Sequence, residues 1–268
     1  MSKEINQNEL ADFLEKILKD SIKFFKDRDL KKLKISLKSD NSQVTQIDIK
    51  VDSYLKAELR RFDKNISILS EESGSSNRKS NLLWMIDPID GTKEFINGSK
   101  EFTVNIALIE NKKPIFGAIF QPMTNTLYLG GNKFKPEKIK DEKRSSLISD
   151  KKESLPNVIL SKSHSNFKEE AFCQEVISIY DNSKIIRMGS SLKFCKLCDG
   201  SAAFYPRFGD INSWDIAAGH AILNASGGDI LDKNFKTLSY SNKKKQIIKG
   251  FVAFSKKEHL NFLKKILL

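Results

Sequence analysis

Two carboxylates at the end of one hydrophobic run constrain this chain more than any other feature. Residues 84–95 are Trp-Met-Ile-Asp-Pro-Ile-Asp-Gly-Thr-Lys-Glu-Phe, so Asp87 and Asp90 flank a Pro and precede a Gly and a Thr. Charged side chains in such a turn contribute little to a core. Carboxylate oxygens are, however, the ligands that Mg²⁺ prefers, together with water and substrate phosphate. Because loops at strand ends commonly carry function, the stretch predicts a strand that ends in a divalent-cation site.

Two further acids follow apolar runs in the same way. Glu71 comes after residues 66–69, and a short parallel or antiparallel pairing with residues 82–86 would bring it beside Asp87. Asp215 lies in the first turn of a predicted helix, where the helix dipole favours an ionised carboxylate. The alternative is that these acids are helix caps and turn residues, and for Asp215 alone that alternative is preferred. Together the set could hold two or three Mg²⁺ ions, which would clamp a phosphate and activate a water.

Hydrophobic periodicity predicts a mixed α/β chain. Helices are expected over 8–27, 47–62, 167–179, 190–200, 213–227 and 256–267, and strands over 66–69, 82–86, 104–109, 115–120, 127–129, 158–160, 202–205 and 251–254. Helices interleaved with hairpins indicate an α+β architecture that contains antiparallel sheet. Residues 133–154 are charged and nearly free of large apolar groups, so we expect a linker or surface loop there. It would separate an N-terminal half, 1–132, with most metal ligands from a C-terminal half, 155–268, that completes the site.

Charge and cysteine content limit the partners and the compartment. The net charge is +12, but no nucleic-acid motif accompanies the lysine-rich tracts, so a solvated basic surface is expected first and steering of an anionic substrate second. Three cysteines, no long apolar run and no signal peptide indicate a cytoplasmic protein, with peripheral contact at the inner membrane left open. We expect no nucleic-acid partner, no integral membrane association, and a monomer or homodimer.

The longer string around the two carboxylates resembles the inositol monophosphatase superfamily of Mg²⁺-dependent, lithium-sensitive phosphatases. The matching strings are Asp-Pro-Ile-Asp-Gly-Thr at 87–92, Glu-Glu-Ser at 71–73 and Trp-Asp-Ile-Ala-Ala-Gly at 214–219. Lys93-Glu94 stands where inositol phosphatases typically have Thr-Asn, which is closer to CysQ-type 3′(2′),5′-bisphosphate nucleotidases. Further strings of that type lie at 101–109, 189–195 and 205–209. The resemblance implies a layered αβαβα sandwich of the inositol monophosphatase/fructose-bisphosphatase type.

The resemblance also implies the roles of the metal and water-activating residues. The implied metal ligands are Glu71, Asp87, the backbone carbonyl of Ile89, Asp90 and Asp215. Gly91 and Thr92 would cradle the phosphate. Asp40 would pair with Thr92, and these two together with Glu71 would position and deprotonate the attacking water. Gln43 stands where the family has Pro, and without the resemblance Asp40 is an ordinary loop acid.

The substrate side follows from the same resemblance. His164 matches the histidine that lines the nucleotide site, although a lone histidine after a strand is more often structural or exposed. Gly189, Ser190 and Lys193 start a predicted helix, and Arg207 could bind a phosphate in bidentate fashion. The implied reaction, in sulfur metabolism, removes the 3′-phosphate of adenosine 3′,5′-bisphosphate by in-line attack of a metal-activated water, giving AMP and phosphate. The alternatives are an inositol or sugar phosphatase, and a nucleotide- or RNA-binding protein without catalysis.

Overall fold

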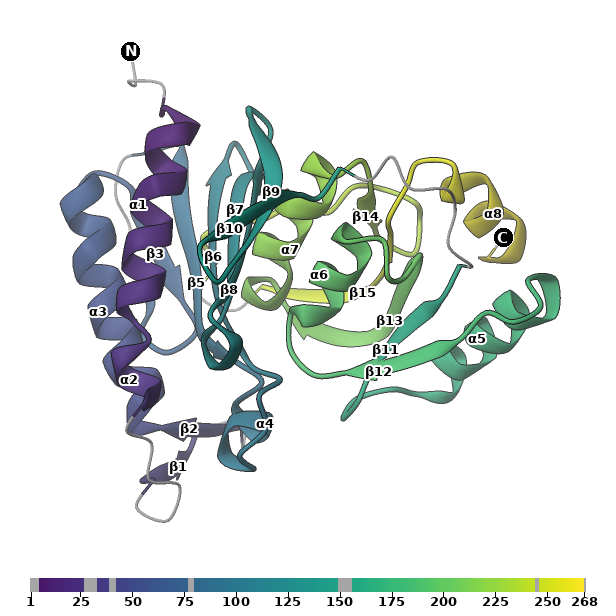
Figure 1. Cartoon of the computed structure of the whole chain (residues 1–268), viewed down its shortest axis with the longest axis horizontal. Helices are drawn as coiled ribbons and strands as arrows, with labels where there is room; N and C mark the ends of the chain where they lie inside the picture. The colour runs from purple at the N-terminus through teal and green to yellow at the C-terminus, as the bar shows by residue number, and fades with distance from the viewer. Residues whose placement is uncertain are drawn as a thin grey trace.

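Five layers of secondary structure, in the order helix, sheet, helix, sheet, helix, make up the molecule (Figure 1). The computed structural model describes residues 5–26, 33–38, 42–76, 80–148, 156–243 and 246–267. The expected αβαβα sandwich is therefore confirmed. Among the described helices, none combines the length and hydrophobicity that a membrane-spanning segment needs.

The first layer consists of α1 (Gln7–Asp20), the short α2 (Lys23–Lys26) and α3 (Gln46–Phe62). One apolar face of these helices is buried, as the periodicity predicts. The helix expected over 8–27 is interrupted after α1 at Ser21, whose hydroxyl donates to the carbonyl of Leu18. A two-stranded ribbon of β1 (Ile35–Leu37) and β2 (Gln43–Thr45) leads into α3.

The larger sheet has eight strands in the order β10-β9-β8-β7-β6-β5-β3-β4. Their bounds are β3 (Ser67–Ser70), β4 (Gly74–Ser76), β5 (Leu82–Asp90), β6 (Thr103–Glu110), β7 (Lys113–Gln121), β8 (Thr126–Gly131), β9 (Phe134–Lys140) and β10 (Lys143–Ser146). The prediction of a linker is wrong for residues 134–146, which form β9 and β10 at the edge of this sheet. Edge strands are commonly rich in charged residues because one side faces water, and this composition hid the hairpin.

The smaller sheet has five strands in the order β12-β11-β13-β15-β14. Their bounds are β11 (Val158–Ser161), β12 (Ile185–Met188), β13 (Phe204–Asn212), β14 (Asp229–Leu231) and β15 (Ile247–Phe254). Helices α6 (Leu192–Cys198) and α7 (Trp214–Ala225) fill the layer between the sheets, and α5 (Phe167–Ile179) and α8 (His259–Leu267) cover the outer face (Figure 1).

Glycines let α7 lie unusually close to the larger sheet. A Cβ atom on Gly117 in β7 would lie 2.2 Å from the carbonyl oxygen of Ala218, and one on Gly130 in β8 would lie 2.9 Å from the Cα of Ile222. Most residues of α7 are buried, as expected for a helix that is apolar on every side. This close packing fixes the start of α7, and with it Asp215, against the larger sheet.

Candidate active site

A β-bulge at the end of β5 brings Asp87 and Asp90 to one side of the sheet. Asp87 pairs with Asn105 of β6, whereas Asp90 pairs with Thr103, so β5 contains one extra residue. In a regular strand, residues three apart point to opposite faces. The extra residue turns Asp90 to the same face as Asp87. Pro88 is tolerated in the bulge because a bulge can leave a backbone position without a hydrogen bond. Both aspartates therefore line the same cavity.

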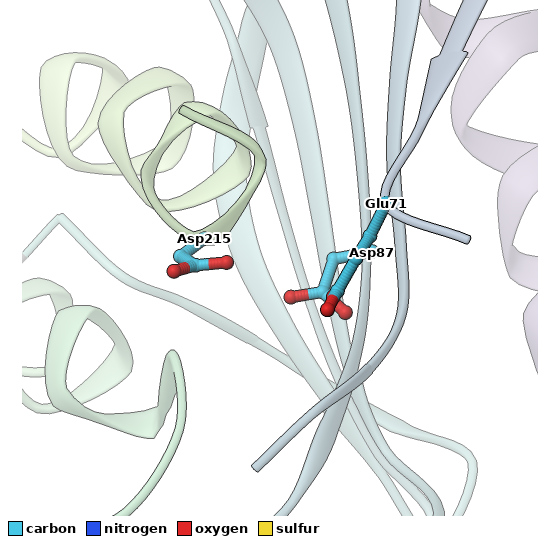
Figure 2. Close-up of side chains that lie close together, drawn as sticks. All are labelled: Glu71, Asp87 and Asp215. Carbon is cyan, nitrogen blue, oxygen red and sulfur yellow. The ribbon is translucent and has the colours of Figure 1, made fainter. Parts of the chain in front are cut away.

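Three carboxylates from three elements converge at this point (Figure 2). Glu71, Asp87 and Asp215 each offer an oxygen, and these oxygens lie within 4.8 Å of one another. Glu71 is brought there by the parallel pairing of β3 with β5, in which its backbone N–H donates to the carbonyl of Ile86 at 3.1 Å. Asp215 enters from the first turn of α7. The expected neighbourhood of Glu71 and Asp87 is thus confirmed, with parallel strands.

The chemistry of this cluster fits a hard divalent cation. Asp87 is 1% exposed, and neither of its carboxylate oxygens receives a hydrogen bond from the described residues. Burial, together with the charges of Glu71 and Asp90, raises the pKa of Asp87 well above its ordinary value. A buried carboxylate without donors requires a proton or a cation to balance it. An oxygen-only ligand set selects Mg²⁺-like ions over soft metals.

Asp215 shares this behaviour. Burial raises its pKa well above the ordinary value, and the charges of Asp90 and Glu71 add to the effect. In the chain without a cation, desolvation and like charges therefore act against the helix dipole, which by itself favours the ionised carboxylate.

Asp90 is tied to the rest of the site by a hydroxyl that sequence reasoning missed. The Oγ of Ser191 lies 2.5 Å from Asp90 Oδ2 and 2.9 Å from the carbonyl oxygen of Asp215, and it accepts a hydrogen bond from Asn105 Nδ2 at 2.8 Å. Ser191 thus joins β5, β6 and the start of α7. The available signal was Asn105, a polar residue in the middle of an otherwise apolar strand.

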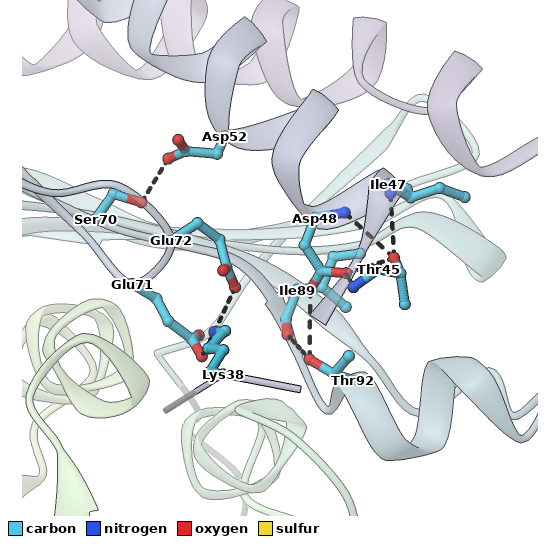
Figure 3. A network of polar contacts seen from close by, with 10 residues as sticks. All are labelled: Lys38, Thr45, Ile47, Asp48, Asp52, Ser70, Glu71, Glu72, Ile89 and Thr92. Carbon is cyan, nitrogen blue, oxygen red and sulfur yellow. Dashed lines mark hydrogen bonds and ion pairs between the residues drawn. The ribbon is translucent and has the colours of Figure 1, made fainter. Parts of the chain in front are cut away.

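Asp48 lies opposite Thr92 (Figure 3). Thr92 Oγ1 lies 3.4 Å from Asp48 Oδ1 and 3.1 Å from the carbonyl oxygen of Ile89. The other oxygen of Asp48 accepts from the backbone N–H of Thr45 at 2.8 Å. Asp40 lies outside the described residues, so its predicted role stays a prediction. Sequence reasoning missed Asp48 because Thr45 and Asp48 form a helix capping box, a pattern that signals structure.

A lysine also reaches the cluster from the end of β1. Lys38 Nζ lies 2.7 Å from an oxygen of Glu71 and 2.7 Å from one of Glu72 (Figure 3). Burial opposes the charged form of Lys38, but the two glutamates outweigh it and raise the pKa of the ammonium. Burial and the charge of Glu71 raise the pKa of Glu72 to about 7. No sequence pattern distinguished Lys38 from the many surface lysines.

The residues predicted to bind substrate line the same cavity, which has a volume of about 500 Å³. They are Gly91, Thr92, His164, Gly189, Ser190, Lys193 and Arg207. Lys193 is buried, and its Nζ donates to the carbonyl of Ser190 at 2.6 Å. Arg207 donates to the carbonyl oxygens of His164 and Asp210. The cavity is therefore lined by the carboxylates Glu71, Asp87, Asp90 and Asp215, which we call its anionic end, and by Lys193 and Arg207, which we call its cationic end and which have Glu94 and Asp210 beside them. This combination suits metal ions and phosphate groups together.

Two details of the cationic end differ from expectation. The N-cap of α6 is Ser191, not Ser190, and Ser190 adopts a left-handed conformation with φ of 51°. Burial, together with the charges of Arg207 and Lys93, lowers the pKa of His164. The imidazole is therefore neutral at neutral pH and can both donate and accept hydrogen bonds.

The model of the inositol monophosphatase family matches residues 5–264. The chain belongs to the inositol monophosphatase family. Two relatives in the family are the 3′(2′),5′-bisphosphate nucleotidases CysQ of Buchnera aphidicola, 38% identical over 78% of this chain and 78% of the relative, and of Escherichia coli K12, 37% identical over 82% and 89%. The crystal structure of CysQ from Bacteroides thetaiotaomicron, 29% identical, superposes with a TM-score of 0.78 over 94% of this chain and 100% of that one.

Proposed function

We propose that this family member is a divalent-cation-dependent phosphatase that removes the 3′-phosphate of adenosine 3′,5′-bisphosphate, giving AMP and phosphate. The observation that carries the proposal is the cavity in which Asp87, a buried carboxylate without hydrogen-bond donors, faces Lys193 and Arg207. A substrate with two phosphates can place one at each end. The names of the curated relatives support the same substrate class.

The metal would be held at the anionic end. We assign Glu71, Asp87, the carbonyl of Ile89, Asp90 and Asp215 as ligands of two or three Mg²⁺ ions. Such ions neutralise phosphate charge and lower the pKa of a coordinated water. Lys38, already paired with Glu71, adds a fixed positive charge beside them.

The proton inventory of Thr92 explains how the attacking water would be oriented. The hydroxyl has one hydrogen, which points to Asp48 Oδ1 or to the carbonyl of Ile89. Its oxygen can therefore only accept a further hydrogen bond, so a water bound there presents a hydrogen to Thr92 and a lone pair to phosphorus. When the hydroxyl hydrogen points to Asp48, Asp48 would take that hydrogen as the Thr92 oxygen takes one from the water, and Glu71 would help to hold the water. We assign to Asp48 the role that the sequence predicted for Asp40.

The cationic end would hold the nucleotide and the phosphate that is not cleaved. Lys193 and Arg207 supply the charges, and Gly189 and Ser190 form the adjoining wall. His164, neutral at neutral pH, would contact the nucleoside. These contacts would distinguish a bisphosphate nucleotide from an inositol phosphate, which lacks the second phosphate.

Compartment and partners complete the proposal. The cysteines Cys173, Cys195 and Cys198 are free and buried, in keeping with a reducing cytoplasm. The enzyme would act on a soluble nucleotide, as a monomer or homodimer and without a nucleic-acid partner.

The test is phosphate release from adenosine 3′,5′-bisphosphate and from inositol 1-phosphate at equal Mg²⁺. We expect a much higher kcat/KM for the nucleotide, and no turnover by Asp90→Asn although its circular dichroism matches the parent. Faster release from inositol 1-phosphate would favour the alternative of an inositol phosphatase. Near-normal turnover by Asp90→Asn would contradict the metal assignment.

A further inference from the structure

A second cavity is lined by residues of α5 and α8. These two helices cover the outer face of the smaller sheet (Figure 1). The volume of the cavity is about 560 Å³, within the range of sites that take small organic molecules. The two helices approach each other where Tyr180 packs on Phe262, with ring centroids 5.2 Å apart. Towards the start of α5 the cavity opens between them. We call this cavity the outer groove, lined among others by Phe167, Ala171, Phe208, Leu231, Phe235 and Leu263.

The lining of the outer groove is aromatic and incompletely covered. Phe167 is 78% exposed, and Phe208 and Phe235 are half-buried. Phe235 has a φ of 57°, an uncommon conformation for a bulky residue. It is held by a tight turn in which Asp232 Oδ1 accepts from the backbone N–H groups of Asn234 and Lys236, both at 2.8 Å. A turn that holds an aromatic ring over an open apolar cavity suits an apolar ligand.

The rim of the outer groove carries unpaired positive charge. Lys168, Lys233 and Lys249 stand on it, against Glu175 and Asp232. Lys249 is paired with Asp210 at 2.7 Å, whereas in the described part of the chain neither Lys168 nor Lys233 forms an ion pair. Among the described residues Glu175 has no ion-pair partner either, whereas the carboxylate of Asp232 accepts from the N–H groups of its turn, so two lysines stand against one unpaired acid. An anionic group at the rim would meet these lysines, while its apolar body reached the aromatic floor.

The outer groove lies back to back with the candidate active site across β13. Arg207 lines the active-site cavity and the next residue, Phe208, lines the outer groove. A bulge between Arg207 and Asp210 and the backbone of Gly250 separate the two; a Cβ on Gly250 would lie 2.9 Å from the carbonyl oxygen of Arg207. Phe208 is also anchored to α5, because its N–H donates to Glu169 Oε1 at 2.7 Å.

We propose that the outer groove binds an organic anion with an aromatic body and a single acidic group, and that its occupancy changes the affinity of the active site for phosphate through Phe208 and Arg207. The binding part stands on the groove alone. The coupling part rests on the proposed function, in which Arg207 contacts the retained phosphate. Phe208 and Arg207 are neighbours in β13, so a ligand that displaced Phe208 would also displace the backbone that holds Arg207.

The binding test uses 1-anilinonaphthalene-8-sulfonate and its uncharged relative N-phenyl-1-naphthylamine, followed by fluorescence with excitation of the naphthyl group. Ala171→Trp fills the groove, and Gln174→Trp places the same ring on α5 outside it. We expect saturable binding of one sulfonate per chain, weakened about tenfold or more by Ala171→Trp and unchanged by Gln174→Trp. If the two variants bound the sulfonate equally well and unfolded at the same temperature, the assignment of the outer groove as the binding site would be wrong.

A charge test uses Lys168→Glu with Lys233→Glu, and Lys184→Glu as a control away from the groove. The double change should weaken binding of the sulfonate about two- to fivefold and leave the uncharged probe unaffected. Equal effects on both probes would overturn the preference for an anion.

The coupling test measures KM for adenosine 3′,5′-bisphosphate with and without saturating sulfonate. We expect KM to change in the parent and in Gln174→Trp but not in Ala171→Trp. An active parent with an unchanged KM would overturn the coupling. Failure of the parent to release phosphate would instead refute the proposed function, and the probe titrations would still decide the groove.

Discussion

Asp48 performs two tasks with its two oxygens. One oxygen caps α3 through Thr45, and the other faces the hydroxyl of Thr92. Burial raises the pKa of Asp48, although the hydrogen bonds from Thr45 act to lower it. A carboxylate held in this way is a stronger base than an exposed one, which is the property that proton removal from water requires.

Replacing Asp48 and Asp40 in turn should therefore show which of the two acts as the general base. We expect Asp48→Asn to lower kcat by about 100-fold or more, the usual contribution of a general base, and Asp40→Asn to leave kcat nearly unchanged. Loss of the cap costs about 1 kcal/mol, so thermal unfolding is recorded alongside activity. Asp52→Asn, one turn along α3 and hydrogen-bonded to Ser70, serves as a matched control. A large loss in Asp40→Asn alone would restore the original prediction.

His164 offers a titration that reports on the cationic end. Burial, Arg207 and Lys93 all lower its pKa, so the ring should gain its proton only at a lower pH than an ordinary histidine. Arg207→Ala removes one positive charge and should raise the pKa of His164. The measurement is an NMR titration, simple because the chain has 3 histidines, with the signal assigned from His164→Gln. A pKa unaffected by Arg207→Ala would show that the two side chains are apart in solution.

At the scale of elements, irregular pieces of backbone place the chemistry. The bulge in β5 turns Asp87 and Asp90 to one side, and the turn before α6 presents Ser191 to them. Without the extra residue in β5, Asp87 and Asp90 would point to opposite faces of the sheet. The regular elements around them supply the rigidity.

Removal of the Ser191 hydroxyl should weaken metal binding more than stability. Ser191→Ala leaves Asp90 and the start of α7 without their shared partner, so the Mg²⁺ concentration for half-maximal activity should rise about tenfold, with a smaller change in kcat. Ser213→Ala is the control, because this hydroxyl is also buried before a helix but has no hydrogen-bond partner in the described chain. The same Mg²⁺ dependence in both variants would argue against the positioning role.

Gly117 tests the close packing of α7. A Cβ there would meet the backbone of Ala218, which cannot move alone, so Gly117→Ala should lower the free energy of unfolding by about 1–3 kcal/mol and disturb Asp215. Gly209→Ala should be tolerated, since its Cβ would come no closer than 3.8 Å to the atoms around it. Chemical denaturation measures both, and equal stabilities would contradict the packing argument.

Sequence patterns predicted the regular parts of this molecule better than its irregular ones. The helix over 167–179 is confirmed at both ends, and a capping box formed by Asn166 and Glu169 marks its start. The hairpin over 134–146 was missed because solvent-facing edge strands resemble loops in composition. The four carboxylates could be found from their places after apolar runs. Lys38, Ser191 and Asp48 could not, because their roles depend on which distant residues the fold brings to them.

At the scale of the whole molecule, the carboxylate cluster costs stability that a cation should restore. The pKa values of Asp87 and Asp215 are raised, so their ionised forms are disfavoured in the folded chain. The cost decreases as the pH falls below the raised pKa values and is gone below the ordinary pKa of an aspartate, so the metal-free chain should gain stability on mild acidification. A cation bound between the larger sheet and α7 would replace the protons.

Metal removal should therefore lower the melting temperature at neutral pH. Mg²⁺ at about 100 times its Kd adds about 2.7 kcal/mol to the stability of the folded state. Asp87→Asn should melt higher than the parent in a chelator, because a repelling charge is gone, and should gain little from Mg²⁺. Scanning calorimetry with and without Mg²⁺ measures the melting temperatures of the parent and the variant. A variant that melts lower than the parent in chelator would show that the carboxylates do not repel one another.

The position of α7 also sets an order in time. During synthesis the larger sheet, with Glu71, Asp87 and Asp90, leaves the ribosome well before Asp215, which only α7 can supply. An unfinished chain thus exposes acidic groups that can attract a cation but cannot enclose it. Phosphatase activity can return only after α7 has docked against β7 and β8. The recovery of activity after refolding would therefore time the final assembly of the layers, a step that the secondary-structure signal alone would not reveal.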